Sequence, residues 1–475
     1  MCRDSNDRRV GSVFQHDSVT TRIWIDVEDV FVFASTGRTP TGIQRLSFEL
    51  CRALYENYGQ AGNIRLVRHS PTRKDFVETS WESLESLFNR LASSVTRPSW
   101  RGVLKARLRS VWRLLPKGLR LPMAKFLRRQ AGALNALIHQ GKPEPIWDPQ
   151  AGDVLFIPGA AWHPDYARMV RTARDIHGVQ VAVLIHDIIA VRRPEWFERK
   201  HAEAFQIWIE SMLPRCDKIF CNSCATANDV LDYARLRDLI LPDTIHPIPI
   251  GTGFARSRTL DELPPPVEAA ALSRLPAPGS SVLFVSTIEA RKNHALLFRV
   301  WRNLLEQMPA EKVRTLVFAG SVGWLVQDLM QRLQNTNSLD GKIVLVAHPD
   351  DDELAALYRG CRFTLFPSLY EGWGLPVTES LAFGKPCVIS NRTSLPEAGG
   401  SLARYFDPED VGDALRVIRA TIEDVDGLAA WGAQVAREFR PVPWENSARE
   451  VMRHLQPDSV MPQQADEKKE LVAGI

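Results

Sequence analysis

Short apolar runs alternate with longer segments of helical periodicity along most of this 475-residue chain. That alternation is typical of parallel sheets whose strands are joined by crossover helices. The sequence therefore predicts an α/β protein with two doubly wound domains. The expected strands are Ile23–Val27, Val154–Pro158, Val179–Ile185, Lys218–Cys221 and Thr244–Pro249 in the first unit, and Val282–Ser286, Thr315–Ala319, Ile343–Ala347, Phe363–Pro367 and Pro386–Ser390 in the second.

A proline-rich segment separates the two sets of strands. It contains Leu263-Pro-Pro-Pro266 and Pro276-Ala-Pro-Gly279, which favour an extended connection over a helix or strand. Two domains also fit the length, because single hydrophobic cores stop growing at about 250–300 residues. We expect an N-terminal domain over residues 1–255, a linker over 256–280, a second domain over 281–440, a further segment over 441–455 and a polar tail over 456–475.

The apolar runs and the cysteines narrow the class of protein. No run reaches the ~18–20 apolar residues that span a bilayer, and the first residues lack the apolar core of a secretory signal. We therefore expect a cytoplasmic protein. Seven cysteines are scattered, and only Cys216, Cys221 and Cys224 cluster. A zinc site would need a second Cys or His pair at similar spacing, so reduced thiols and no metal are predicted.

The most informative segment runs from Pro367 to Pro386 and reads PSLYEGWGLPVTESLAFGKP. It follows a predicted strand and leads into a helix expected to begin near Leu375. Gly372 and Gly374 allow the backbone to approach a ligand closely. The start of the helix offers free N–H groups and a positive dipole end to an anion such as phosphate. In a doubly wound sheet the ligand crevice lies at this end of the strands.

Two carboxylates, Glu371 and Glu379, bracket this turn. Carboxylates accept hydrogen bonds from sugar hydroxyls, so the pair suits a ligand with hydroxyls at both ends and phosphate between them. The alternative is that Glu371 caps the helix and Glu379 is a solvated helix residue. The residue types alone leave both interpretations open.

In their context, Glu371 and Glu379 resemble the E-x7-E signature of retaining nucleotide-sugar glycosyltransferases of family 4, the glycosyl transferases group 1. The flanking EGWGLP and A-x-G-x-P elements make the match specific. The resemblance covers roughly Trp24–Leu455 and is weakest between about 60 and 150. It implies the GT-B-type fold, with two Rossmann-like domains facing across a cleft. It also implies donor-binding roles for Glu371, Gly372, Trp373, Gly374, Leu375 and Glu379.

Ser286-Thr-Ile-Glu-Ala-Arg-Lys-Asn293 resembles the donor-phosphate loop of that family. The resemblance implies that Lys292, with Arg291, neutralises the diphosphate as the leaving group departs. Some family members carry a basic residue where Ser286 stands. Cations are disfavoured in the first turn of a helix, and a bound anion would remove that conflict. The alternative is a surface Arg-Lys pair.

Other residues that follow predicted strands carry the same resemblance. Gly320 and Ser321 are similar to the loop that lines the donor cleft, and His348 stands where the family packs the nucleobase. Thr41-Gly-Ile-Gln-Arg45, before a helix expected over Leu46–Leu54, resembles a glycine-containing loop at the cleft, with Gly42 as its glycine. Taken alone, Gly42 could equally belong to an ordinary helix N-terminus.

The first domain also contains a His-Asp pair. His186 and Asp187 follow a predicted strand and resemble the family motif in which the histidine hydrogen-bonds the transferred sugar. A lone histidine here would otherwise indicate a core residue. Asn222-Ser223 and Thr226 are similar to a segment that faces the acceptor. Trp444–Ala448 resembles a helix that crosses back onto the first domain.

The resemblance implies a mechanism and a substrate class. The catalytic residues would be His186, Asp187, Glu371, Arg291 and Lys292, acting without a metal or other cofactor in a front-face displacement. The expected donor is a nucleoside diphosphate sugar, with GDP-mannose favoured, and the expected acceptor is a lipid-linked glycan of a bacterial surface polysaccharide. Two alternatives stay open: a nucleotide-sugar hydrolase or epimerase of GT-B type, and a non-catalytic, membrane-docked assembly scaffold.

Net charge is unevenly distributed along the chain. Residues 86–143 contain 13 Lys or Arg and no Asp or Glu; because the whole chain is +3, the remainder carries −10. A basic helix with one apolar stripe is suited to an anionic membrane surface, so we expect peripheral association with the inner face of the cell membrane. The alternative is a helix packed on the acceptor domain. No nucleic-acid recognition motif accompanies the charge. The expected membrane contacts are Arg101, Lys105, Arg109, Trp112 and Arg113.

Overall fold

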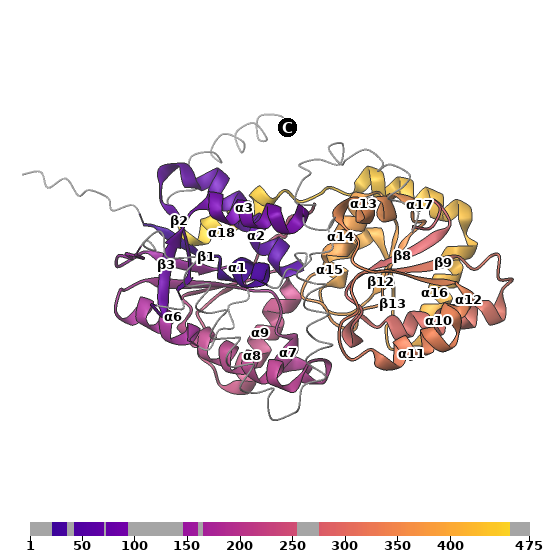
Figure 1. Ribbon diagram of the computed structural model, residues 1–475, viewed down its shortest axis with the longest axis horizontal. Coiled ribbons are helices and arrows are strands. Elements are labelled where there is room, and N and C mark those ends of the chain that lie inside the picture. Colours follow the sequence, from indigo (N-terminus) through magenta and orange to yellow (C-terminus); the bar gives the residue numbers. More distant parts are fainter. Residues whose placement is uncertain are drawn as a thin grey trace, which may run out of the picture.

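Two β-sheets, one in each half of the chain, organise the structure (Figure 1). The computed structural model describes residues 21–35, 42–70, 73–93, 146–159, 165–253 and 275–456. The expected membrane-contact residues 101–113, most of the expected linker and all but one residue of the expected tail lie outside these ranges. Among the helices that the structure does describe, none combines the length and the apolar character needed to cross a bilayer.

The first sheet has seven strands in the order β3-β2-β1-β4-β5-β6-β7. Only β3 runs antiparallel to its neighbour, and the other pairs are parallel. The β2–β3 hairpin was not expected, because charged residues such as Arg65, Arg68 and Glu78 interrupt its apolar pattern. The strands are β1 (Ile23–Asp26), β2 (Ile64–Ser70), β3 (Asp75–Thr79), β4 (Val154–Ile157), β5 (Gln180–Ile185), β6 (Lys218–Cys221) and β7 (Ile245–Pro247).

The helices of the first domain join or flank these strands. The helix expected over Leu46–Leu54 is longer than predicted, because α2 already begins at Gly42 and continues to Tyr58. The described helices are α1 (Glu28–Ser35), α2 (Gly42–Tyr58), α3 (Trp81–Ser93), α6 (Tyr166–Asp175), α7 (Ile189–Arg192), α8 (Arg199–Met212) and α9 (Cys224–Arg237).

The second sheet has six parallel strands in the order β10-β9-β8-β11-β12-β13. All five strands expected here are present within one or two residues at each end. The edge strand β13 was missed, since three of its four residues are half-buried and its apolar signal is weak. The strands are β8 (Ser281–Val285), β9 (Thr315–Ala319), β10 (Ile343–Val346), β11 (Thr364–Phe366), β12 (Cys387–Ser390) and β13 (Ala403–Phe406).

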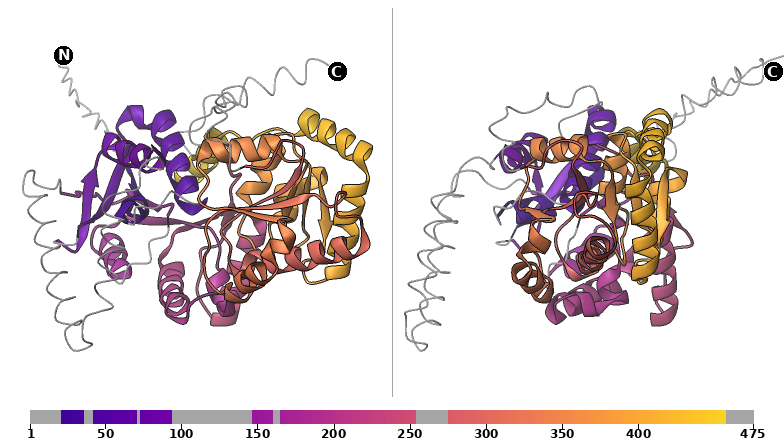
Figure 2. Two further views of the ribbon diagram at one scale, coloured as in Figure 1. Left: turned by 45° about the vertical axis from the view of Figure 1, so that its right-hand side comes forward. Right: turned by 90° about the vertical axis from the view of Figure 1, so that its right-hand side faces the viewer.

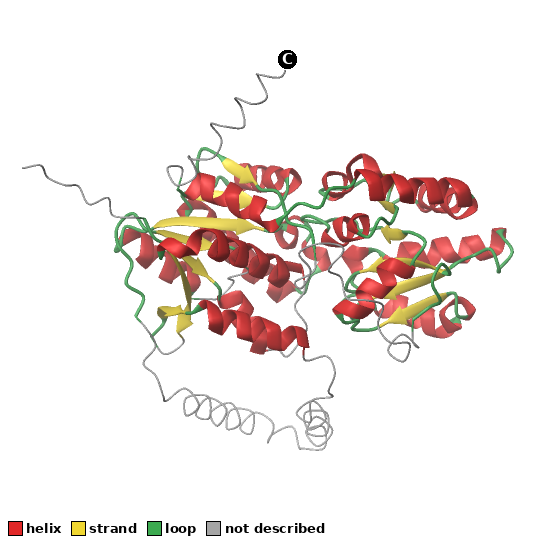
Figure 3. Ribbon diagram, turned by 90° about the horizontal axis from the view of Figure 1, so that it is seen from above, coloured by secondary structure: helices red, strands yellow, loops and turns green. Residues whose placement is uncertain are grey.

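Helices cover both faces of the second sheet (Figures 2 and 3). Capping side chains fix where several of them begin. For example, Asp350 accepts a hydrogen bond from the Glu353 N–H, and Glu353 accepts one from Asp350, which satisfies two donors at the start of α13. The helices are α10 (His294–Gln307), α11 (Gln327–Asn335), α12 (Asn337–Asp340), α13 (Asp351–Gly360), α14 (Leu375–Ala382), α15 (Leu395–Gly399), α16 (Val411–Glu423), α17 (Val425–Glu438) and α18 (Trp444–Leu455).

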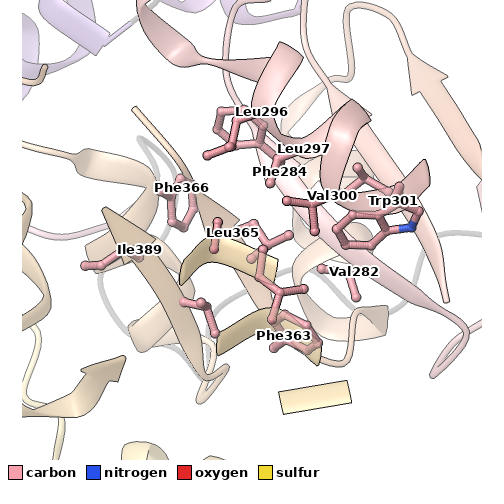
Figure 4. Packing of buried hydrophobic residues seen from close by; sticks show 14 of the residues in the cluster. Val282, Phe284, Leu296, Leu297, Val300, Trp301, Phe363, Leu365, Phe366 and Ile389 are labelled. Atoms are coloured by element: carbon pink, nitrogen blue, oxygen red, sulfur yellow. The ribbon is translucent and has the colours of Figure 1, made fainter. Parts of the chain in front are cut away.

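The core of the second domain lies between α10 and the sheet. Figure 4 shows Leu297, Val300 and Trp301 of α10 packed with Phe284 and Leu365 from the strands. Burial of each such side chain contributes about 1.5–3 kcal/mol. The Trp301 indole also donates to the Arg314 carbonyl at 2.8 Å, so its one polar group is satisfied. This packing holds the loops after β8 and β11 on a rigid base.

The chain returns to the first domain at α18, the last helix within the described residues (Figure 1). Ala448, Val451 and Met452 are fully buried in the core of the first domain, beside α2. The Trp444 ring lies so close to Gly251 that a Cβ there would approach it to 2.2 Å. The helix is therefore part of the first domain in packing, although it follows the second domain in sequence.

Each sheet has one place where the strand order reverses. In the first sheet this place lies between β1 and β4, and in the second between β8 and β11. Loops at the carboxyl ends of the strands diverge there and leave a crevice in doubly wound folds. The segments that follow β8 and β11 are those in which the sequence analysis placed the donor residues.

Candidate active site

Predicted site residues of the two domains meet directly. A Cβ added to Gly372 would lie 2.0 Å from the His186 carbonyl oxygen, which belongs to the first domain. Similarly, a Cβ added to Gly42 would lie 3.8 Å from a methyl group of Leu375. The loop after β11 in the second domain therefore lies against the loop after β5 and the start of α2 in the first.

Glu371 is held by two cations from the loop after β8. Arg291 Nη1 donates to Glu371 Oε2 at 2.8 Å, and Lys292 Nζ donates to Oε1 at 2.6 Å. The three side chains are 12–16% exposed. Burial by itself would raise the pKa of Glu371, but the charges of Arg291 and Lys292 lower it to about 2. The carboxylate therefore stays ionised throughout the physiological pH range.

The charges of Arg291 and Lys292 are already compensated within the protein. Both residues lie in the short 3₁₀ turn Ala290–Lys292, and Arg291 also donates to Glu289 at 2.8 Å. The sequence analysis expected a bound anion to offset two cations at a helix start, whereas Glu371 and Glu289 supply that negative charge. A diphosphate bound here would share these cations with Glu371.

Backbone contacts fix the phosphate loop against the loop after β11. The Leu369 N–H donates to the Arg291 carbonyl at 2.9 Å. Asn293, in the left-handed region with φ 59°, donates through Nδ2 to the Pro367 carbonyl at 3.2 Å. The two segments therefore form one rigid unit below the crevice.

Glu379 lies at the other end of the donor segment, on α14, and is only 9% exposed. The Tyr358 hydroxyl donates to its Oε2 at 3.0 Å. Burial raises the pKa of Glu379, against the opposing effects of the Arg45 charge and this hydrogen bond. Arg45 reaches in from α2 of the first domain and forms an ion pair with Asp351.

The alternative roles of the two carboxylates, as a helix cap and as a solvated helix residue, do not fit this geometry. Gly374, with φ 124°, occupies the cap position of α14, and no side chain caps that helix, so Glu371 is not its cap. Glu379 is buried rather than solvated. Glu371 is paired with cations of its own domain, whereas Glu379 is also influenced by the charge of Arg45 from the first domain.

His186 is buried, and its Nε2 lies 2.7 Å from the Pro158 carbonyl oxygen. A carbonyl only accepts, so this contact assigns the ring proton to Nε2. Burial lowers the pKa of His186, which keeps the ring neutral. Among the described residues its Nδ1 is buried and has no hydrogen-bond partner. The adjacent Asp187 accepts from the Ile189 N–H at 3.1 Å.

The remaining donor candidates lie as follows. Ser321 Oγ and His348 Nδ1 are 2.9 Å apart, so the loops after β9 and β10 meet. A Cβ added to Gly320 would lie 2.1 Å from the Ser286 carbonyl oxygen, which explains glycine there. Trp373 packs against the cores of both domains, and its indole N–H is buried without a partner among the described residues.

One expectation about the first domain needs correction. Gly42 is the first residue of α2 and not part of a loop before it, because the helix starts four residues earlier than predicted. Ser223 and Thr226 were expected to face the acceptor, and in the structure both hydroxyls lie within hydrogen-bond distance of the Gly372 carbonyl oxygen. They therefore contact the donor segment.

The sequence analysis missed several residues that shape the site. Thr393 accepts from the Glu371 N–H at 2.9 Å, and Ser394 donates to the carbonyls of Glu371 and Trp373 at 2.9 and 2.7 Å. The signal that could have found them is their position just after strand β12, at the same sheet edge as the other donor loops. Tyr358 lies on a helix, where no such signal exists, whereas Arg45 ends the Thr41–Arg45 segment that was expected at the cleft.

Parts of the chain are similar to known proteins. Residues 273–436 match the family model described as Glycosyl transferases group 1. The chain is 28% identical over 284 residues to the serotype-specific mannosyltransferase WbdA of Escherichia coli, an alignment that covers 58% of this chain and 34% of that protein. It is 31% identical over 170 residues to the O-antigen chain mannosyltransferase B of Escherichia coli, covering 36% and 44%. The chain therefore spans less than half the length of these two relatives.

A solved structure shows the fold. Sucrose-phosphate synthase from Thermosynechococcus elongatus superimposes with a TM-score of 0.52 at 18% sequence identity, covering 96% of this chain and 100% of that one. The predicted fold class is thus confirmed: the chain has two Rossmann-like α/β domains in the GT-B arrangement.

The pairing of Glu371 makes a testable prediction about acid stability. Its pKa in the folded protein lies below the ordinary value of 4.5, so the carboxylate stabilises the fold above pH 4.5, and this contribution disappears as the pH falls towards 2. At pH 7, Glu371→Gln should lower the free energy of unfolding by about 1.5–3 kcal/mol. The difference from the unsubstituted protein should shrink steadily below pH 4.5 in thermal unfolding measured from pH 7 to pH 3.

Glu423→Gln is the matched control, because Glu423 forms an exposed pair with Arg419 and such pairs contribute little. A difference for Glu371→Gln that does not change with pH would contradict the assignment.

Proposed function

We propose that this protein is a retaining glycosyltransferase that moves a hexose, with mannose favoured, from a nucleoside diphosphate sugar to a glycan acceptor of a bacterial surface polysaccharide. The observation that carries the proposal is the grouping of Glu371, Arg291 and Lys292 at the carboxyl ends of β8 and β11. The family-model match over residues 273–436 and the two mannosyltransferase relatives support it.

Each group of the donor has a counterpart in the site. Arg291 and Lys292 supply the positive charge for the diphosphate and for the charge that develops as it leaves. Glu379 suits the ribose hydroxyls, because a buried carboxylate accepts strong hydrogen bonds. His186 Nδ1 accepts from a hydroxyl of the transferred sugar.

The proposed reaction is a front-face displacement. The acceptor oxygen bonds to the anomeric carbon while the bond from that carbon to the phosphate oxygen breaks on the same face. The acceptor proton passes to the departing phosphate, which Arg291 and Lys292 stabilise. No carboxylate nucleophile is required, because Glu371 is engaged by the two cations and Asp187 by a backbone N–H. The proposal includes no metal ion.

A transfer assay with a nucleotide panel tests this function. We expect GDP to raise the melting temperature more than UDP, dTDP or ADP, because a ligand that binds only the native state stabilises it. Donor turnover should depend on added glycan acceptor and should persist in excess EDTA. Turnover without acceptor would favour the hydrolase or epimerase alternative. Absence of both nucleotide binding and turnover would favour the scaffold.

Glu379 provides a second test, because stability and binding should respond in opposite ways. Burial raises its pKa, so Glu379→Gln removes an unfavourable buried charge and should leave the melting temperature unchanged or higher. The affinity for the donor nucleotide should fall roughly 10- to 100-fold, as expected for loss of hydrogen bonds to a charged group. Calorimetric titration measures the affinity, with Glu423→Gln as control. Unchanged affinity would remove Glu379 from the donor site.

We further propose that the basic segment 86–143 holds the enzyme on the cytoplasmic face of the cell membrane, near a lipid-linked acceptor. Its support is the charge pattern of the sequence. The protein should float with vesicles containing anionic phosphatidylglycerol, and reversal of Arg101, Lys105, Arg109 and Arg113 to Glu should abolish flotation. Reversal of four exposed arginines of the second domain, Arg302, Arg332, Arg416 and Arg437, changes the net charge equally and should not. Equal flotation of both variants would refute the proposal.

A further inference from the structure

Helix α9 of the first domain begins on a carboxylate that belongs to the second domain. The backbone N–H groups of Cys224 and Ala225 donate to the two carboxylate oxygens of Glu397, each at 2.8 Å. Glu397 lies on α15, directly after the segment that holds the donor loop. The negative charge meets the positive end of the helix dipole, which makes both bonds favourable.

The same turn of α9 also holds the donor loop itself. Ser223 Oγ donates to the Gly372 carbonyl at 2.7 Å, and Thr226 Oγ1 approaches the same oxygen at 3.2 Å. These contacts are buried, whereas the contact to Glu397 is exposed. Gly372 lies between Glu371 and Trp373 in the sequence, so hydrogen bonds to its carbonyl also restrict the backbone of these two neighbours.

Residues just before α15 form further hydrogen bonds with the donor loop. Thr393 binds the Glu371 N–H, and Ser394 binds the Glu371 and Trp373 carbonyls. Glu397 follows three residues later and reaches the first domain. A single short segment thus links the position of Glu371 to the contact between the domains.

Two further hydrogen bonds cross between the domains near this point. The Tyr370 hydroxyl donates to Asp229 of α9, and the Trp324 indole donates to the Trp196 carbonyl at 2.8 Å. Because Gly372 lies against the His186 carbonyl with no room for a Cβ, these contacts belong to a closed cleft.

We propose that Glu397 and the N-terminus of α9 form an interdomain latch that fixes the closed cleft and, through Thr393 and Ser394, the donor loop. Glu397 is a positioning residue, because it acts on the site through that segment. Its exposure allows water to replace the contact, so the latch can release when products leave. The catalytic part of this inference rests on the proposed transferase function, whereas the latch itself does not.

The thiol of Cys224 can report whether the latch is closed. Cys224 is the first residue of α9 and is exposed, whereas the other described cysteines are buried. Burial and the nearby Glu397 carboxylate raise the pKa of Cys224. Since Glu397 and Cys224 belong to different domains, Glu397 influences this thiol only while the domains are closed.

The first experiment measures alkylation of Cys224 by iodoacetamide, a neutral reagent, with peptide mass spectrometry to assign the site. In Glu397→Gln the thiol should react about fivefold faster at pH 7.5, because the neighbouring negative charge is gone and the helix end favours the thiolate. Glu423→Gln, which removes an exposed carboxylate elsewhere in the second domain, should react like the unsubstituted protein. Equal rates in the two variants would overturn the latch, whatever the activity of the protein.

The second experiment separates positioning from folding or donor binding. Glu397→Lys places a cation at the N-terminus of α9 and should lower kcat about tenfold or more. Its nucleotide affinity should stay within about twofold of that of the unsubstituted protein, and its melting temperature within a few degrees. Glu397→Asp, which restores the charge, should recover part of the rate. An unchanged kcat in Glu397→Lys, or a loss of nucleotide affinity equal to the loss of kcat, would overturn the positioning role.

Discussion

The buried contact of Glu371 with Arg291 and Lys292 is the interaction on which the site depends. Taking three charges out of water is unfavourable unless they are well paired. The pairing therefore forces the loop after β8 and the loop after β11 to one fixed separation. The same loop after β11 continues through Gly372, which passes the His186 carbonyl, to the start of α14.

Much of the fold could be predicted because its strands are buried on both faces. Such strands are short apolar runs, and ten of the thirteen described strands were found as such a run. The three that were missed, β2, β3 and β13, lie towards the edges of their sheets and are part polar. Edge position alone does not hide a strand, because β7 and β10 also lie at sheet edges and were predicted. The polar residues of β2, β3 and β13 are what weaken their apolar pattern.

The residues of the candidate site also fall into those that the sequence could predict and those that it could not. Residues directly after strands, such as Glu371, Lys292 and His186, could be found because parallel strands bring their carboxyl ends together. Some of their partners could not: Tyr358 lies on a helix, away from the strand ends, and the approach of Arg45 to Glu379 depends on how the two domains meet. Ser223 and Thr226, at the start of α9, show this for a contact between domains. Their place after a strand could be read from the sequence, but their partner, the Gly372 carbonyl, lies in the other domain.

The return of α18 to the first domain has a mechanical consequence. The chain passes between the domains twice, and the two passages are tied together, because the Thr252 N–H donates to the Val442 carbonyl at 2.8 Å. One covalent connection would allow twisting in any direction, whereas two connections side by side act as a hinge with a preferred axis. The bond between Thr252 and Val442 therefore restricts how one domain can turn against the other.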